Sequence, residues 1–264
     1  ALLTSEAIVG VITLCTDFGT QDPYAGIMKG VILAVDPTAQ VVDITHQVEA
    51  QDIREAAFIV QDYWGYFPAG TVHVVVVDPT VGSSRRPVAV SRNGHFFVGP
   101  DNGIFSFIAD RASEVRMIEN PEYMREAISP TFHGRDIFSP AAAWLSRGLA
   151  PELLGTRITG PVVLHDIHPV ITENTMTGDI VRFDHFGNAI TNINREQFAS
   201  FVQDRQYTIT IDELSFTSLR RSYYEGEIVC LAGSSGYIEF GVFQGNFRTR
   251  TGVQKRDPVV ISAR

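Results

Sequence analysis

Four apolar, strand-like runs in the N-terminal part of the chain each end in a polar motif. The runs VGVITLCTDFG, QVVDITH, TVHVVVVDP and HFFVGPDNG end, in turn, at Asp17, at Asp43 and His46, at Asp78, and at Asp101 and Asn102. Parallel strands of an open α/β sheet deliver their carboxyl ends to one edge, where ligands bind, so these side chains are expected to gather there. Asp-Pro and Asp-Asn-Gly are also ordinary turn signals, so a purely structural role for any single motif stays open.

Strand-like and helix-like patterns alternate through residues 9–148. Apolar residues recur at helical spacing over residues 24–35 and 53–64, and a third helical pattern runs over residues 136–145 with Asp136 as its expected N-cap. Strands are expected at residues 9–15, 41–44, 72–77, 87–91, 95–98 and 115–118. The run at 72–77 is apolar without a break, which is typical of a strand covered on both faces. This alternation predicts an α/β domain with a mostly parallel sheet flanked by helices.

The pattern changes after Pro151. Short strand-like runs then follow one another, separated by clusters of Gly, Asn, Asp and Ser, at residues 178–183, 207–211, 227–231, 236–243 and 258–262. A single short helical turn is expected near residues 196–201. Runs of this length and spacing predict a smaller antiparallel β-barrel domain. We therefore divide the chain into an α/β domain of residues 1–160 and a β-barrel-like domain of residues 161–264.

Composition narrows the classes of function. The net charge of −9 and the pI of about 5.2 argue against nucleic acid as the main partner, because phosphate binding needs a basic face. Cys15 and Cys230 lie far apart in apolar runs, which favours buried thiols in a reducing compartment. No stretch approaches the roughly 18 consecutive apolar residues of a membrane span, and no signal peptide is visible, so we expect a cytoplasmic protein without a membrane segment.

The loop after Asp78 reads Asp-Pro-Thr-Val-Gly-Ser-Ser-Arg and places a guanidinium seven residues after a carboxylate. That spacing lets the loop fold back so that Arg85 pairs with Asp78 and keeps it ionised. Arg86 is the other candidate for this pair, and spacing alone does not choose between the two. A structural Asp–Arg brace is the alternative to a reactive carboxylate.

The segment Phe132-His133-Gly134-Arg135-Asp136 leads into the third helical pattern. His133 lies in the preceding loop, from which an imidazole can reach the edge of the sheet, and Gly134 lets a ligand approach the backbone. A surface histidine is the alternative.

The carboxylates and histidines of these motifs also raise the alternative of a two-metal hydrolytic site. Its candidates are Asp17, His46, Asp78, His133 and Asp136. No pair among them has the tight spacing of HxH or HExxH, and Arg85 competes for Asp78, so we expect no metal.

Two motifs in the C-terminal part predict different roles. Asp184-His185-Phe186-Gly187-Asn188 offers an aromatic ring and an amide suited to stacking on a purine and bonding its edge, with a β-bulge around a core Phe186 as the alternative. Gly233-Ser234-Ser235-Gly236 is interpreted as a turn.

Taken together, eight segments resemble one family in order along the chain. They are TDFG at 16–19, YAGIMKG at 24–30, DITH at 43–46, VDPTVGSSRR at 77–86, FVGPDNG at 97–103, TFHGRDIFSPAAA at 131–143, FGNAITNI at 186–193 and GSSGYIEF at 233–240. The chain resembles the S-adenosyl-L-methionine hydroxide adenosyltransferases, adenosine-forming hydrolases related to adenosyl-fluorinases and chlorinases. The resemblance implies an N-terminal α/β domain, a C-terminal β-barrel-like domain, and a homotrimer whose active sites combine the two domains of neighbouring subunits.

The resemblance also implies roles for particular residues. Asp78, Arg85 and His133 match the catalytic constellation of the hydrolases. The matched substrate contacts are Asp17 and Asp22 for the ribose, Phe186 and Asn188 for adenine, Asp184 and Ser234 for the methionine ammonium and carboxylate, and Phe132 as a further contact. The substrate implied is S-adenosyl-L-methionine, and no cofactor is required.

Hydrolases and halogenases of this family differ at positions present here. Halogenating relatives lack an acidic residue at the position of Asp78 and the histidine at 133, and fluorinases replace Gly134 with Ser and insert an extra loop after the arginine. The chain therefore resembles the hydrolases, with an adenosyl halogenase or a non-catalytic S-adenosylmethionine sensor as alternatives. Thr80 replaces the usual Gly of the family and would oppose a positive φ in the loop. Ser235 stands where some halogenases carry an arginine, so backbone N–H groups are expected to contribute more to carboxylate binding.

Overall fold

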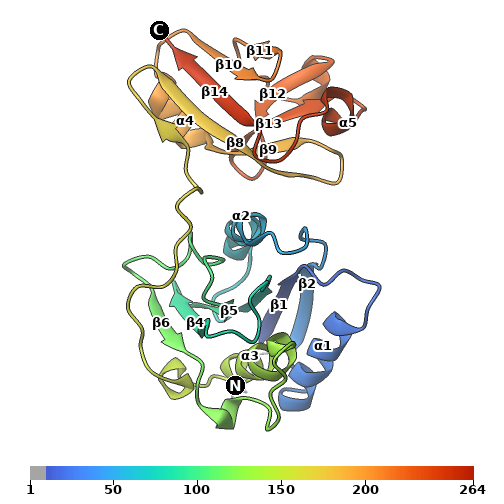
Figure 1. Ribbon diagram of the computed structural model, residues 1–264, viewed down its shortest axis with the longest axis vertical. Helices are drawn as coiled ribbons and strands as arrows, with labels where there is room; N and C mark the ends of the chain where they lie inside the picture. The colour runs from blue at the N-terminus through green and yellow to red at the C-terminus, as the bar shows by residue number, and fades with distance from the viewer. Residues whose placement is uncertain (1–9) are drawn as a thin grey trace, which may run out of the picture. The chain divides into compact units, whose positions relative to one another are not determined.

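The computed structural model describes residues 10–264, and the chain divides into two compact units after Leu164 (Figure 1). The first residue of the strand predicted at 9–15 lies outside the described residues. No helix within residues 10–264 combines the length and hydropathy of a bilayer-spanning segment.

The N-terminal unit is built on a six-stranded sheet in the order β2-β1-β3-β5-β4-β6. Its strands are β1 (Val11–Thr16), β2 (Gln40–Thr45), β3 (Val72–Val76), β4 (Pro87–Arg92), β5 (His95–Pro100) and β6 (Glu114–Met117). β1 pairs in parallel with β2 and β3, and β3 pairs in parallel with β5, whereas β4 runs antiparallel to both β5 and β6. The four runs that end in polar motifs are therefore the four parallel strands, and the predicted α/β sheet is confirmed.

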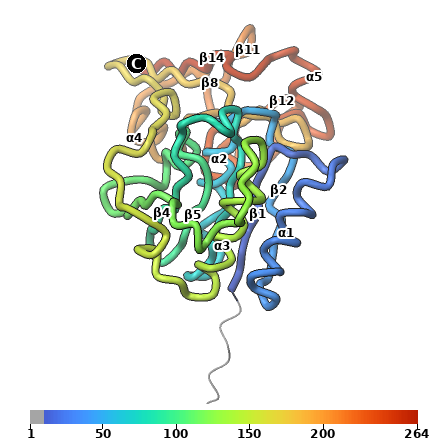
Figure 2. Tube along the Cα trace, turned by 60° about the horizontal axis from the view of Figure 1, so that its bottom comes forward, coloured from blue at the N-terminus to red at the C-terminus, as the bar shows by residue number. Residues whose placement is uncertain are grey.

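Helices cover both faces of this sheet. α1 (Tyr24–Val35) and α3 (Ser139–Ser146) share one apolar core with the β1 and β3 side chains of one face, and α2 (Ile53–Tyr63) shares a second core with the opposite face (Figure 1). α1 runs alongside β2 (Figure 2). Every residue of β3 is buried, because helices pack on both its faces. Short helical turns, η1 (Trp64–Tyr66), η2 (Pro121–Tyr123) and η4 (Pro151–Leu154), complete the unit.

The expected N-cap role of Asp136 is wrong. The helical segment begins earlier, with a π-helical turn, η3 (Gly134–Phe138), that continues directly into α3. Asp136 lies inside this turn with its side chain buried, where it accepts hydrogen bonds from the backbone N–H of Ser129 at 2.8 Å and from Arg135 at 2.7 Å. The Asp136 carboxylate therefore bonds to the Ser129 backbone and the Arg135 side chain, and it does not cap the helix.

The C-terminal unit is an antiparallel, nearly closed β-barrel, as predicted (Figure 1). The strand order is β11-β10-β14-β8-β9-β13-β12, with β7 paired to β8. The elements are β7 (Val170–Ile171), β8 (Thr175–Phe183), β9 (Ala189–Asn194), α4 (Arg195–Val202), β10 (Tyr207–Ile211), β11 (Leu214–Phe216), η5 (Tyr223–Glu225), β12 (Ile228–Ala232), β13 (Tyr237–Val242), α5 (Phe247–Thr251) and β14 (Pro258–Ala263). The inward side chains of these strands, with those of α4 and α5, form its own apolar core.

A buried polar chain crosses the sheet of the N-terminal unit near the amino ends of β1, β3 and β5. The Thr13 hydroxyl lies 3.3 Å from the Tyr63 hydroxyl and 2.9 Å from Nδ1 of His73, whose Nε2 lies 3.2 Å from Nδ1 of His95. Burial, aided by the neighbouring His95, lowers the pKa of His73 from 6.5 to about 3. Folding therefore requires this imidazole to be neutral.

Replacing His73 by Gln is expected to reduce the acid sensitivity of the N-terminal unit. Below pH 6.5 His73 is protonated in the unfolded chain, but in the folded chain it stays neutral until the pH falls to about 3. The free energy of unfolding therefore decreases as the pH falls through this range. Urea unfolding at pH 7.5 and 5.0, followed by the fluorescence of Trp64 and Trp144, reports this unit because both tryptophans lie in it. The wild type should lose roughly 1–2 kcal/mol more than the variant.

An exposed histidine of the other unit supplies the control. His185→Gln should show the pH dependence of the wild type. An unchanged loss of stability in His73→Gln would contradict the assignment.

Candidate functional site

Asp17 and Asp78 follow the two neighbouring strands at which the sheet order changes direction. The chain leaves β1 for β2 on one side and then crosses to β3 on the other, which makes the ends of β1 and β3 a topological switch point. Asp17 is half-buried and accepts a hydrogen bond from the backbone N–H of Gln51 at 2.8 Å. Burial raises the pKa of Asp17, and the charge of Asp78 raises it further, against these backbone donors. The two carboxylates are therefore close enough to interact.

Asp78 pairs with Arg85, the first of its two candidate partners. Arg85 Nε donates to Oδ2 of Asp78 at 2.8 Å, and Nη2 donates to the same oxygen. Both side chains are almost wholly buried. Oδ1 of Asp78 has only a weak contact, 3.5 Å from the Thr80 hydroxyl. One carboxylate oxygen is thus committed to the guanidinium, whereas the other keeps most of its capacity to accept a proton or a hydrogen bond.

His133 joins this pair through Arg85. Arg85 Nη2 lies 2.7 Å from Nδ1 of His133. A guanidinium has only donors, so Nδ1 must be the unprotonated acceptor and the ring proton must lie on Nε2. Burial and the charge of Arg85 lower the pKa of His133, against the charges of Asp78 and Asp136. The imidazole is therefore neutral at pH 7, with a donor at Nε2.

The loop before η3 holds His133 beside an aromatic cluster. The ring of Phe132 contacts Phe18 and Tyr24 edge to face, with centroids 5.9 and 5.4 Å apart. A Cβ on Gly134 would lie 3.2 Å from the Met28 sulfur and 3.4 Å from the Phe132 ring, so a side chain there would crowd this cluster. Phe132, a predicted substrate contact, thus forms the wall next to His133.

The remaining polar groups of the four motifs have other partners. Asp101 is buried and pairs with Arg86, the alternative partner considered for Asp78, and also accepts from the backbone N–H of Val162 at 2.8 Å. His46 is buried between Asp43, 3.1 Å away, and the Thr16 hydroxyl, 2.8 Å away. Predicted site residue Asp22 is exposed just before α1. Of the four carboxylates at this edge, Asp17 and Asp78 are therefore the pair that interacts at the switch point.

The residues considered for the two-metal alternative each bond to partners outside that set, such as Arg85 for both Asp78 and His133. Within residues 10–264, the one group of carboxylates, histidines and cysteines close enough to share an ion is Glu49, Asp52 and Glu55, whose oxygens lie within 4.8 Å of one another. This acidic group contains none of the predicted site residues.

The expected conflict at Thr80 does not arise. The residue of this loop with a positive φ is Gly82, at 82°, and Thr80 is not among the described residues with positive φ. A Cβ on Gly82 would also collide with the carbonyl of Pro130. The position of this loop that requires a glycine is therefore Gly82, two residues after Thr80.

In the C-terminal unit, residues 184–188 form the turn between β8 and β9. Asp184 organises the turn: its Oδ1 accepts from the backbone N–H groups of Phe186 and Asn188, and its Oδ2 accepts from the Asn188 side-chain amide at 2.9 Å. Phe186 is 70% exposed, so the alternative of a core phenylalanine is wrong. Gly187 has φ +82°, and a Cβ there would overlap Asn246. The turn thus presents an aromatic ring outward from a rigid base.

The segment Gly233–Gly236 is the predicted turn, between β12 and β13. The backbone N–H of Gly236 donates to the carbonyl of Gly233 at 3.0 Å, and Ser234 is exposed. Two residues that the sequence did not single out lie behind this turn and the 184–188 turn, namely Glu239 and Tyr223, whose hydroxyl donates to the Glu239 carboxylate. A charged residue inside the otherwise apolar run of β13 is the sequence signal that marks Glu239.

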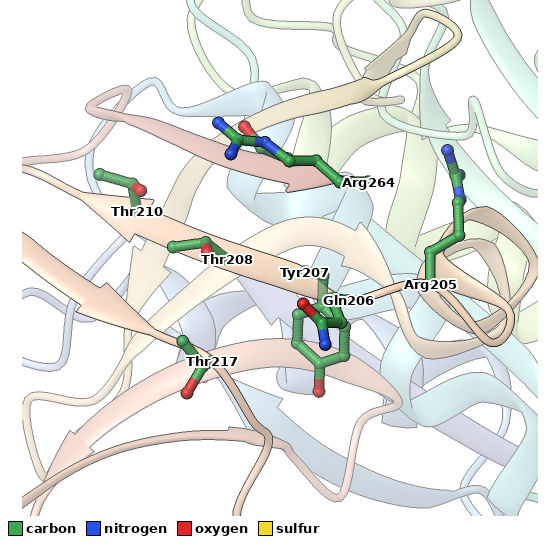
Figure 3. A pocket seen from close by; sticks show the side chains of 8 residues that line it. Arg205, Gln206, Tyr207, Thr208, Thr210, Thr217 and Arg264 are labelled. Carbon is green, nitrogen blue, oxygen red and sulfur yellow. The ribbon is translucent and has the colours of Figure 1, made fainter.

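A pocket of about 760 Å³ lies elsewhere in the C-terminal unit, over β10 and the end of β14 (Figure 3). It is lined by Arg205, Gln206, Tyr207, Thr208, Thr210, Thr217, Ser262 and Arg264. The guanidinium of Arg205 donates to the backbone carbonyls of Glu173 and Phe201, and the side chains of Arg205 and Arg264 extend in different directions. The pocket contains none of the predicted site residues.

Comparison with known families agrees with this division. The chain matches the SAM hydroxide adenosyltransferase N-terminal domain over residues 12–155 and the C-terminal domain of the same family over residues 178–260.

The chain belongs to the SAM hydroxide adenosyltransferase family.

Similar proteins include the (R)-S-adenosyl-L-methionine hydrolase of Thermus thermophilus, 36% identical across 92% of this chain and 96% of the relative. A crystal structure of an uncharacterized conserved protein from Thermotoga maritima has a TM-score of 0.86 and 33% identity across 96% of this chain and 99% of its own. The fluorinase of Nocardia brasiliensis is more distant, 26% identical across 70% of this chain and 71% of the relative. This chain is thus more similar to the hydrolase than to the fluorinase.

Removing the Arg85 charge is expected to raise the pKa of His133. In Arg85→Met the nearby charges that remain are those of Asp78 and Asp136, and both favour the imidazolium. An NMR titration of protein labelled with [13Cε1]histidine measures this pKa directly. Arg86→Met is the matched control because Arg86 pairs with Asp101. A His133 pKa that stays constant or falls in Arg85→Met would contradict the contact.

Proposed function

We propose that this protein hydrolyses S-adenosyl-L-methionine to adenosine and L-methionine by attack of water at C5′ of the ribose. The observation that carries the proposal is the buried Asp78–Arg85 pair, joined by the half-buried His133, at the switch point of the sheet. The hydrolase relative supports the same reaction.

The nucleophile needs more assistance than the leaving group. As the water oxygen bonds to C5′, the bond from C5′ to sulfur breaks and its electron pair neutralises the sulfonium. Methionine therefore leaves as a neutral thioether and needs no acid. Water is a weak nucleophile, and alignment contributes several kcal/mol while a positioned base contributes about 10²–10⁴-fold.

Asp78 is the base that this geometry favours. His133 holds its proton on Nε2, and its Nδ1 faces a guanidinium, so neither nitrogen accepts a proton from water. Oδ1 of Asp78 receives the proton, since Arg85 occupies Oδ2. Arg85 Nη1 is buried without a hydrogen-bond partner among residues 10–264, and its hydrogens are available to the water oxygen. His133 contributes a second donor through Nε2.

The other predicted residues are proposed to hold the substrate. Asp17 and Asp22 bind the ribose, and a carboxylate such as Asp17 accepts hydrogen bonds from both ribose hydroxyls at once. Phe186 and Asn188 bind adenine, and Asp184 and Ser234 bind the ammonium and carboxylate of methionine. The rings of Phe18, Tyr24 and Phe132 form a wall of the kind that stabilises a cation such as the sulfonium. This scheme requires no metal or organic cofactor.

The direct test is product analysis. Purified protein is incubated with S-adenosylmethionine, with and without chloride, and nucleosides are resolved by chromatography. Adenosine and methionine in equal amounts, independent of chloride, support the hydrolase. A halogenated adenosine, or binding without product, would contradict it and indicate a halogenase or a sensor, respectively.

Asp78→Asn is expected to lower kcat at least about tenfold and to leave KM nearly unchanged, because the amide keeps the shape but loses the basic oxygen. Asp43→Asn is the matched control: Asp43 is an exposed carboxylate at the end of β2, and kcat should stay within about threefold. Steady-state kinetics by chromatography provide the comparison. Equal kcat values for Asp78→Asn and the wild type would exclude Asp78 as the base.

We also propose a homotrimer in which one subunit supplies Asp78 and its neighbour supplies Asp184. The support is the family resemblance and the position of these residues in different units. Light scattering should give a mass about three times 29.1 kDa.

Mixed trimers test the sharing of sites between subunits. Co-expression of Asp78→Asn with Asp184→Ala in equal amounts should restore about a quarter of the sites. A site works only where one subunit supplies an intact Asp78 and its neighbour supplies an intact Asp184, and each of these conditions holds for half of the subunits. Sites built from single subunits would give no restoration.

A further inference from the structure

Glu239 is a buried carboxylate in an apolar strand. It is 5% exposed, and its neighbours in β13, Ile238 and Phe240, point into the barrel core. Glu239 therefore points to the opposite face of the sheet, in register with Ile190 of β9 and Leu231 of β12. Burying a carboxylate here costs free energy that an aliphatic side chain would avoid, which calls for a specific role.

The surroundings of Glu239 are shaped to accept it. A Cβ on Gly233 would overlap the Glu239 carboxylate, so the Gly233–Gly236 turn closes directly against this side chain. A Cβ on Gly241 would lie 2.7 Å from both Asn188 Oδ1 and the ring of Tyr223. Two glycines thus make room for one polar cluster.

The cluster fixes the orientation of Asn188. Tyr223 donates its hydroxyl hydrogen to Glu239, so its oxygen is free to accept from Asn188 Nδ2, 3.4 Å away. Nδ2 also donates to Asp184 at 2.9 Å. Each amide hydrogen of Asn188 therefore has its own acceptor: one bonds to Asp184 and the other to the Tyr223 hydroxyl. Glu239 holds that hydroxyl in place and so acts on Asn188 indirectly.

The charges of this cluster favour a cationic ligand. Burial raises the pKa of Glu239 and the charge of Asp184 raises it further, whereas the hydrogen bond from Tyr223 and the charge of Arg182 lower it. Burial and Glu239 also raise the pKa of Tyr223, so its hydroxyl stays a donor. A cation bound at Asp184 would relieve the repulsion between the two carboxylates.

We propose that Glu239 is a positioning residue for substrate binding, a role that rests on the hydrolase function proposed above. Glu239 holds Tyr223 and supports the Gly233–Gly236 turn, and through them it sets the orientation of Asn188, Asp184 and Ser234. It does not touch the reacting atoms. Its loss should therefore act on KM, because the proposed base and its partners, Asp78, Arg85 and His133, belong to the other unit.

Glu239→Gln is the main test, with steady-state kinetics on S-adenosylmethionine. The amide keeps the size of the side chain but loses the charge and places donors where the carboxylate only accepts, so KM should rise about tenfold while kcat at saturation stays within about twofold. Glu227→Gln is the matched control, since Glu227 is an exposed glutamate of the same unit paired with Arg250, and its KM should equal that of the wild type.

Tyr223→Phe keeps the proposal testable if Glu239→Gln does not fold. This variant leaves the carboxylate in place and removes only the hydroxyl that links it to Asn188, so KM should rise by about threefold to tenfold with kcat retained. Glu239→Asp, which restores the charge on a shorter side chain, should reverse part of the KM increase seen in Glu239→Gln.

The outcomes separate this proposal from the proposed function. Absence of turnover in the wild type would overturn the hydrolase assignment and, with it, the role given to Glu239. A wild type that hydrolyses S-adenosylmethionine, together with unchanged KM in both Glu239→Gln and Tyr223→Phe, would overturn the role of Glu239 alone. A fall in kcat with KM constant would also overturn it.

Discussion

Parallel pairing of β1, β2, β3 and β5 is the constraint on which the N-terminal site depends. It sends four strand ends to one edge of the sheet, and the crossing of the chain from β2 to β3 opens the switch point between Asp17 and Asp78. The strand β3 can bring Asp78 there because it is buried on both faces, which ties its end rigidly to two apolar cores. A carboxylate at the end of such a strand keeps its position without support from a ligand.

Arg85 orients both of its neighbours, Asp78 and His133. As a group with donors alone, it fixes one oxygen of Asp78 and the tautomer of His133 in a single set of contacts. The same contacts leave Oδ1 of Asp78 as the acceptor and Nε2 of His133 as a donor. A lysine at this position could hold a charge near Asp78 but could not form the paired, planar contacts that orient both neighbours.

The fold, and the contact between Asp78 and Arg85 in the candidate site, could be predicted because their signals are local. Apolar runs that end in carboxylates, and the spacing from Asp78 to Arg85, are visible within short windows of sequence. The choice of Arg85 over Arg86 could not be predicted, because it depends on Asp101, which follows β5 and pairs with Arg86. Asp136 was misassigned for a related reason: a cap is a local pattern, but the contact with Ser129 depends on the path of the preceding loop, and the helical turn already begins at Gly134. The contact on which the proposed role of Glu239 rests could not be predicted, since its partner Tyr223 comes from a separate segment of the chain.

The two buried carboxylates at the centre of these proposals are stabilised in opposite ways, and the difference matches the charges of the proposed substrate. Asp78 is paired with a full cation, so the charge of Asp78 itself contributes little to holding the cationic ground state that we propose to bind beside it. Glu239 is held by a neutral hydroxyl, and its neighbour Asp184 is held by backbone N–H groups and an amide. The charge of Arg182 offsets this only in part. In the proposed function, negative charge is therefore retained where the ammonium binds, and the charge of Asp78 is neutralised where the sulfonium loses its charge, which favours turnover over tight binding of the substrate.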